Sequence, residues 1–291
     1  MGGMTTTAEP ATVEPGVLPL EGLPRRLFSC TPSRLASWVD CPRSYRMRYL
    51  DRPRPQEGPP WAHNSLGASV HNALAGWWRL PLQRRTPASA GQLLDAAWSS
   101  EGFRDEAQSE AWRAESHDMV ERYVADLDPH DEPLGVERTL AARTDRLALS
   151  GRVDRLDDRD GELVVVDYKT GRRPLTIDDA RGSLALALYA TAASRTLRRP
   201  CTKVELHHLP TGDVLEWEHT EESLERQVRR SEAIADEIVG AGTDPAADPD
   251  AFPARPGGQC GWCSFRAHCP EGQQAAPARD PWAALGEPPG H

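Results

Sequence analysis

Four cysteines are divided between the two ends of this chain of 291 residues. Cys41 lies near the start, whereas Cys260, Cys263 and Cys269 lie near the end, in the run QCGWCSFRAHC. A C-x2-C-x5-C run is typical of cysteines that wrap a metal ion or an iron–sulfur cluster, and Cys41 is suited to supply a fourth ligand. Such a site would join the two ends of the chain, and the chemistry would lie between them.

The composition excludes several classes of protein. Hydrophobic residues make up 38% of the chain and charged residues 27%, which allows a substantial core. No run of about 18 apolar residues is present, so no membrane span is predicted. The first residues lack the pattern of a signal peptide, and we expect a cytoplasmic protein, in which thiols stay free to bind metal.

The net charge of −10 argues against nonspecific coating of nucleic acid. It does not exclude a local basic groove, because arginines are concentrated in the N-terminal part and recur at Arg172 and Arg173. Each arginine taken alone is equally compatible with a solvated helix face. The N-terminal set comprises Arg25, Arg26, Arg34, Arg43, Arg46, Arg48, Arg52 and Arg54.

We expect a disordered segment at 1–26, a single domain at 27–270 and a flexible, Pro-, Gly- and Ala-rich tail at 271–291. Helical patterns are mixed with strand patterns inside the domain, which predicts an α/β fold. The predicted helices cover residues 32–41, 65–79, 91–99, 105–128, 180–196 and 220–240. The predicted strands cover residues 135–144, 146–158, 162–170, 202–209 and 213–218.

A hairpin is predicted at the centre of the chain, because Asp160-Gly161 suits a two-residue turn. In that register Asp154 faces Asp167, and directly opposed side chains lie about 5 Å apart on one face. Lys169 projects from the same face as Asp167. The two carboxylates would repel each other unless a cation lies between them, and a divalent metal ion is the economical solution.

The hairpin alone leaves two interpretations open. In the first, a bound metal polarises a phosphate and lowers the pKa of a water molecule, while the lysine stabilises developing negative charge. In the second, the hairpin is a surface feature in which Asp154 pairs with Arg152 or Arg155, and Asp167 pairs with Lys169. A shift of one residue in the register would remove the first interpretation.

The order of the motifs along the chain resembles the PD-(D/E)XK nuclease superfamily, and within it the RecB-type exonuclease branch. The resemblance spans residues 30–270. It is carried by Ser33-Arg34-Leu35 through Trp38 to Cys41-Pro42, by Gly67 to His71, by Gly151 to Asp154-Arg155-Leu156-Asp157, by Asp167-Tyr168-Lys169-Thr170-Gly171, and by Tyr189.

The resemblance implies a restriction-endonuclease-like core, with a central mixed sheet flanked by helices and a helical N-terminal part. By the same resemblance Lys169 is the catalytic lysine and Tyr189 helps to place the DNA strand. Its implied ligands for Mg²⁺ or Mn²⁺ are His71, Asp154, Asp167 and the backbone carbonyl of Tyr168.

The cysteines resemble the iron–sulfur staple of AddB nucleases, in which one cysteine precedes the nuclease core and three follow it. The resemblance thus implies a [4Fe-4S] cluster on Cys41, Cys260, Cys263 and Cys269. The residue types alone do not distinguish this cluster from zinc.

We expect a metal-dependent exonuclease that acts on single-stranded DNA ends in repair or recombination. The chain has no G-x-x-x-x-G-K-[ST] phosphate loop, so it would work beside a separate helicase or on ends already unwound. One departure supports a rival: Ala185 stands where the family has a glutamine, so the protein could be a non-catalytic iron–sulfur DNA-binding or scaffold protein. A redox sensor is a third hypothesis. Glu137 is not assigned to the site, because the pattern does not establish which face of its strand it occupies.

Overall fold

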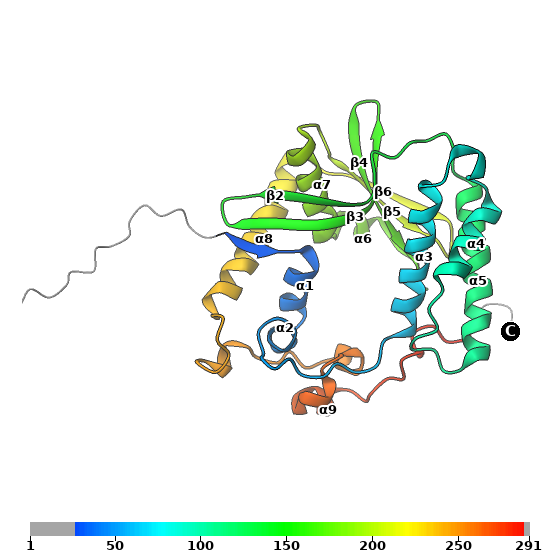
Figure 1. Ribbon diagram of the computed structural model, residues 1–291. Coiled ribbons are helices and arrows are strands. Elements are labelled where there is room, and N and C mark those ends of the chain that lie inside the picture. Colours follow the sequence, from blue (N-terminus) through cyan, green and yellow to red (C-terminus); the bar gives the residue numbers. More distant parts are fainter. Residues whose placement is uncertain (1–26, 288–291) are drawn as a thin grey trace, which may run out of the picture.

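The computed structural model describes residues 27–287 (Figure 1). The segment predicted to be disordered, 1–26, lies outside the described residues, as do residues 288–291. The helices are α1 (Pro32–Asp40), α2 (Pro42–Tyr49), α3 (Ala62–Trp78), α4 (Pro87–Ala97), α5 (Glu106–Ala125), α6 (Ile177–Gly182), α7 (Leu184–Leu197), α8 (Glu221–Gly240) and α9 (Pro270–Ala275). The strands are β1 (Phe28–Cys30), β2 (Gly135–Arg143), β3 (Leu147–Arg159), β4 (Glu162–Lys169), β5 (Lys203–His208) and β6 (Asp213–Glu218).

The predicted α/β class is confirmed, but α2 and α9 were not among the predicted helices and one predicted helix is divided in two. Cys41 has an extended backbone and Pro42 starts a second helix directly after it, so α2 was missed. The helix predicted over 180–196 is divided into α6 and α7 at Ser183, whose hydroxyl accepts a hydrogen bond from the backbone N–H of Leu186.

The sheet is mixed, and β3 is its centre. Antiparallel β2 covers one edge of β3 along most of its length. The other edge is shared, because parallel β1 pairs with Leu147–Leu149 and antiparallel β4 pairs with Arg155–Arg159. Residues 150–154 of β3 therefore lie in a gap between β1 and β4. β4 continues the sheet to parallel β5, and β5 to antiparallel β6.

Helices cover both faces of the sheet (Figure 1), and a hydrophobic core lies beneath the helices of each face. One contains Val165 with side chains from α1, α7 and α8, and the other contains Val164 and Val166 with side chains from α3, α4 and α5. β4 is thus apolar on both faces, which explains its unbroken run of valines. Within the described part of the chain, no helix combines the length and the apolar character that crossing a membrane requires.

The C-terminal segment, for which a flexible tail was predicted, packs against the domain as far as the structure describes it. Leu285 is only 4% exposed and lies in the core formed with α3–α5, and Trp282 packs against the same core. Carbonyl oxygens of the segment accept hydrogen bonds from the domain: Pro281 O from Ala62 N, and Leu285 O from Arg172 Nη1 at 2.6 Å. These anchors lie within the Pro-, Gly- and Ala-rich stretch at 271–291 that suggested a tail.

We therefore expect Leu285→Ala to destabilise the protein by about 2–4 kcal/mol, because it leaves a cavity in a buried core. Urea denaturation of the full chain measures this change. Leu82→Ala is the matched control, since Leu82 is 37% exposed, and it should change stability by less than about 0.5 kcal/mol. Equal stabilities for Leu285→Ala and the wild type would show that the segment is not docked.

Candidate active site

Three potential metal ligands from different elements converge beside the gap in β3. They are His71 on α3, Glu137 on β2 and Asp154 on β3, and one ligand atom from each lies within 4.8 Å of the others. His71 Nδ1 is 3.3 Å from Asp154 Oδ1. Among the described residues this is the one group of three or more His, Cys, Asp or Glu side chains with such spacing. One imidazole and two carboxylates form a donor set suited to Mg²⁺ or Mn²⁺.

The hairpin register that was predicted from Asp160-Gly161 is confirmed. Both turn residues have positive φ, and the pairing runs from Arg159↔Glu162 to Arg155↔Val166. Asp154 and Asp167 are the next opposed positions. The backbone pairing of β3 with β4 ends before these positions. A side-chain hydrogen bond continues the connection, because Asp154 Oδ2 accepts a 2.8 Å hydrogen bond from the backbone N–H of Tyr168. One oxygen of Asp154 is thus held by β4 while the other contacts His71.

Asp167 lies apart from the group of three ligands in this structure. Its Oδ2 contacts the ammonium of Lys169, and this oxygen makes no hydrogen bond of regular geometry with any described residue. Burial raises the pKa of Asp167; Lys169 opposes this rise, and the charge of Asp154 adds to it. The two carboxylates expected to share a metal are therefore neighbours with different partners, and the ligand role of Asp167 stays a prediction.

The surface-hairpin interpretation fails for Asp154. Arg152 pairs with Glu137, and Arg155 pairs with Asp157, so neither neutralises Asp154. Its partner is His71. Burial alone would lower the pKa of His71, but the hydrogen bond and charge of Asp154, with the charges of Asp167 and Glu137, outweigh burial and raise that pKa. The carboxylates of the site therefore favour the charged form of this imidazole.

Glu137 is the residue that the sequence analysis left unassigned. The β2–β3 register, Val136↔Arg155 and Arg138↔Val153, places Glu137 opposite Asp154. Its φ is +50°, a conformation that is costly for a residue with a side chain, and such strain is concentrated at functional sites. A four-residue turn between Arg143 and Ala148 is enough to set this pairing. Nothing in the sequence indicates the positive φ of Glu137.

A pocket of about 810 Å³ opens onto these groups, and we call it the metal pocket. Tyr189 forms part of its wall, and the ring packs so closely on Gly151 that a Cβ there would lie 2.4 Å from Tyr189 Cε1. Burial, followed by the charges of Asp167 and Asp154, raises the pKa of Tyr189 to about 12. Ala185 lies one turn before Tyr189 on α7, and its methyl side chain lacks the amide group that a glutamine would supply there. Besides Tyr189, the predicted residues that line the pocket are His71, Asp154, Tyr168 and Lys169.

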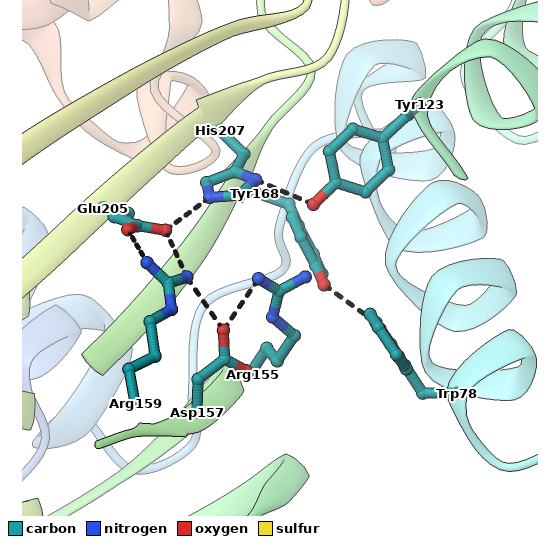
Figure 2. A network of polar contacts seen from close by, with 8 residues as sticks. All are labelled: Trp78, Tyr123, Arg155, Asp157, Arg159, Tyr168, Glu205 and His207. Atoms are coloured by element: carbon teal, nitrogen blue, oxygen red, sulfur yellow. Dashed lines mark hydrogen bonds and ion pairs between the residues drawn. The ribbon is translucent and has the colours of Figure 1, made fainter. Parts of the chain in front are cut away.

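A buried polar network lies behind the strand that carries Asp167 and Lys169 (Figure 2). The side chain of Tyr168 lies in this network, and its hydroxyl accepts a hydrogen bond from Trp78 Nε1 at 3.3 Å. From Tyr123 the contacts run through His207 to Glu205, which also pairs with Arg159. Asp157 receives hydrogen bonds from both Arg155 and Arg159. These contacts connect β3, β4 and β5 with α3 and α5, and so hold the backbone of the site.

The four predicted cluster cysteines line a second cavity of about 630 Å³, which we call the thiol cavity. All four are free thiols, and they come from the α1–α2 junction and from the segment before α9. Backbone N–H groups of Gly257 and Gly272 lie 3.4 Å from Cys260 Sγ and Cys269 Sγ. Cysteines from the two parts of the chain therefore line one cavity, whereas the predicted staple stays a prediction. Ser33 lines both this cavity and the metal pocket.

Comparison with known proteins gives a family and a fold. A family model described as the PD-(D/E)XK nuclease superfamily matches residues 29–270. The crystal structure of a "Putative exonuclease" from Eubacterium rectale is 13% identical, with a TM-score of 0.55 over 82% of this chain and 86% of that one. The crystal structure of SSO0001 is 14% identical over 83% and 85% of the two chains, with a TM-score of 0.37. No curated protein sequence matches.

We predict that Glu137→Gln and His71→Ala each weaken Mn²⁺ binding at least about 10-fold, since even partners outside the first ligand shell contribute about 10–100-fold. Isothermal titration with Mn²⁺ alone measures the affinity. His117→Ala is the matched control, because His117 Nδ1 lies 3.2 Å from Asp95 in a similar pair on the outer surface. Unchanged binding in Glu137→Gln would remove Glu137 from the site.

The buried network predicts a pH dependence of stability. Burial alone would raise the pKa of Glu205, but the hydrogen bonds and charges of His207 and Arg159 outweigh burial and lower that pKa to about 2. A depressed carboxyl pKa stabilises the fold above the ordinary pKa of Glu, near 4.3, and this stability is lost as the pH falls toward 2. Glu205→Gln should therefore be less stable than the wild type at pH 7. The difference should shrink below about pH 4, as measured by urea denaturation at several pH values.

Proposed function

Because this chain belongs to the PD-(D/E)XK nuclease superfamily, we propose that it is a metal-dependent exodeoxyribonuclease of the RecB type that acts on single-stranded DNA ends. The observation that carries the proposal is the position of the group His71, Glu137 and Asp154. It lies in a pocket that also holds Lys169 and Tyr189. A separate helicase, or prior unwinding, would supply the ends in repair or recombination.

The donor set fits a divalent cation. Carboxylate oxygens and one imidazole are present, and Asp154 is already oriented by the backbone of Tyr168. We assign the metal to His71, Glu137 and Asp154, with Asp167 and the carbonyl of Tyr168 completing the site when the carboxylate of Asp167 turns from Lys169. When bound, the metal would polarise the phosphate and make a water molecule more acidic.

The residues of the chain supply the remaining parts of the mechanism. Lys169 is half-exposed at the end of β4, where its ammonium can orient the attacking water or stabilise negative charge on the phosphate. It is one of only two lysines in a chain with 34 basic residues, the other being Lys203. Tyr189 presents its ring beside the pocket and would position the strand by contact with a base or sugar.

We also propose that the thiol cavity holds a [4Fe-4S] cluster. Tetrahedral zinc needs thiolate sulfurs about 3.8 Å apart, and the described cysteines form no group of three within 4.8 Å. The 630 Å³ cavity around four free thiols suits a larger group. A cluster there would stabilise the contact between α1–α2 and the C-terminal segment, because the energy of ligation is also folding energy.

The decisive experiment is digestion of end-labelled single-stranded and duplex DNA with Mn²⁺ or Mg²⁺, on protein purified without oxygen and with iron and sulfide counted. Lys169→Ala should lower cleavage at least about 100-fold, while Mn²⁺ affinity and iron content stay unchanged. Lys203→Ala is the matched control, since Lys203 also pairs with a strand carboxylate, Glu162, at 3.2 Å.

Two results would count against the nuclease. Cleavage that persists in Lys169→Ala would show that Lys169 is not the catalytic lysine or that the activity belongs to a contaminant. Absence of cleavage in iron-loaded wild type that still binds DNA would favour the scaffold alternative and identify Ala185 as the altered position.

A further inference from the structure

Two tryptophans of this chain lie outside both hydrophobic cores. Seven of the nine tryptophans lie within a core or pack against one. The exceptions are Trp61, at the start of α3, and Trp262, in the cysteine run. They contact each other with ring centroids 5.3 Å apart, although 200 residues separate them. A contact between half-buried aromatic rings outside any core requires an explanation other than core packing.

His63 completes an aromatic group with these residues, and we call Trp61, His63 and Trp262 the aromatic trio. The His63 ring lies 6.2 Å from each of the two indoles and is tilted by 33° from Trp61, so these two rings face in similar directions. All three side chains are partly exposed. Burial lowers the pKa of His63, so its ring is neutral at pH 7. His63 Nδ1 is buried and accepts no hydrogen bond from any described residue.

Two members of the trio line the two cavities, and Trp61 contacts both of these members. His63 lines the metal pocket, Trp262 lines the thiol cavity, and Ser33 lines both. His63 is also two turns before the ligand His71 on α3. A polynucleotide chain with one phosphate in the metal pocket would therefore have neighbouring nucleotides within reach of these rings.

The backbone beneath the trio is held by contacts with distant segments. Trp61 occupies the N-cap position of α3 without a capping side chain, although Ser, Thr, Asp and Asn are preferred there. The orphan N–H of Ala62 is instead bonded to Pro281 O of the C-terminal segment. Gly102 approaches so closely that a Cβ there would lie 2.5 Å from Pro60 O. Arg279 lies over the Trp262 ring at 5.7 Å and adds positive charge.

We propose that the aromatic trio is a stacking platform for unpaired bases of the DNA strand that is cut in the metal pocket. Aromatic faces bind any base by stacking, whereas bases inside a duplex have their faces covered by their neighbours. The platform therefore selects single-stranded over duplex DNA without reading sequence. This inference rests on the proposed nuclease function, because the DNA strand assigned to the platform is the strand that would be cut in the metal pocket.

The test measures binding, so that it does not depend on cleavage. Fluorescence anisotropy is recorded with labelled oligo(dT) of about 12 nucleotides, with an abasic oligomer of the same length, and with a duplex. The buffer contains no divalent cations. The variants are Trp61→Leu, Trp262→Leu and Trp61→Phe, and the iron content of each is compared with that of the wild type.

We expect Trp61→Leu and Trp262→Leu to bind oligo(dT) about 10-fold more weakly and to bind the abasic oligomer as the wild type does. Trp61→Phe, which keeps a ring, should retain most of the affinity. Trp217→Leu is the matched control: Trp217 has His219 at 6.2 Å and Arg181 at 5.7 Å, but it packs against a core and lines neither cavity. It should bind as the wild type does.

The proposal is overturned if Trp61→Leu with normal iron content binds oligo(dT) like the wild type, or if it loses affinity equally for the abasic oligomer. A wild type that prefers duplex DNA would also overturn it. Cleavage lost in Lys169→Ala together with unaltered binding in Trp61→Leu would reject the platform and leave the nuclease. Ring-dependent binding without any cleavage would reject the nuclease and leave the platform.

Discussion

The site depends on one hydrogen bond, which the backbone N–H of Tyr168 donates to the carboxylate of Asp154. β3 shares one edge between β1 and β4, and Asp154 lies in the interval where neither strand is paired with it. Its side chain bonds the N–H of Tyr168 and so extends the β3–β4 ladder by one step, while its other oxygen reaches His71 on α3. A break in the sheet thereby orients a carboxylate, one oxygen of which is held by the backbone of β4.

The opposite face of β4 shows how that orientation is maintained. Arg155, Glu205 and His207 are each no more than 5% exposed, and burying charged groups costs free energy unless they are paired. Here they are connected to one another and to Asp157 and Arg159, with Tyr168 enclosed among aromatic rings (Figure 2). The network adds directional constraints that an apolar core lacks, and those constraints act on the strand that carries Asp167 and Lys169.

The central hairpin could be predicted from the sequence because its information is local. Asp160 and Gly161 determine the turn, and the turn determines every pairing as far as Arg155↔Val166. Glu137, the aromatic trio and the docked Leu285 could not be predicted, since each depends on segments far apart in the chain. Glu137 lies beside Asp154 because its own backbone in β2 adopts a positive φ. Leu285 is buried by helices that precede it by more than 150 residues.

The sequence by itself determined the α/β class, the hairpin register and the set of residues that resembles a nuclease motif, because alternation, turn chemistry and motif order are properties of short segments. Only the tertiary structure decided which carboxylates share the space around His71. It places Glu137 there and turns Asp167 toward Lys169. The reason is physical: ligand geometry depends on side-chain direction to within about an ångström, and packing between distant elements sets that direction.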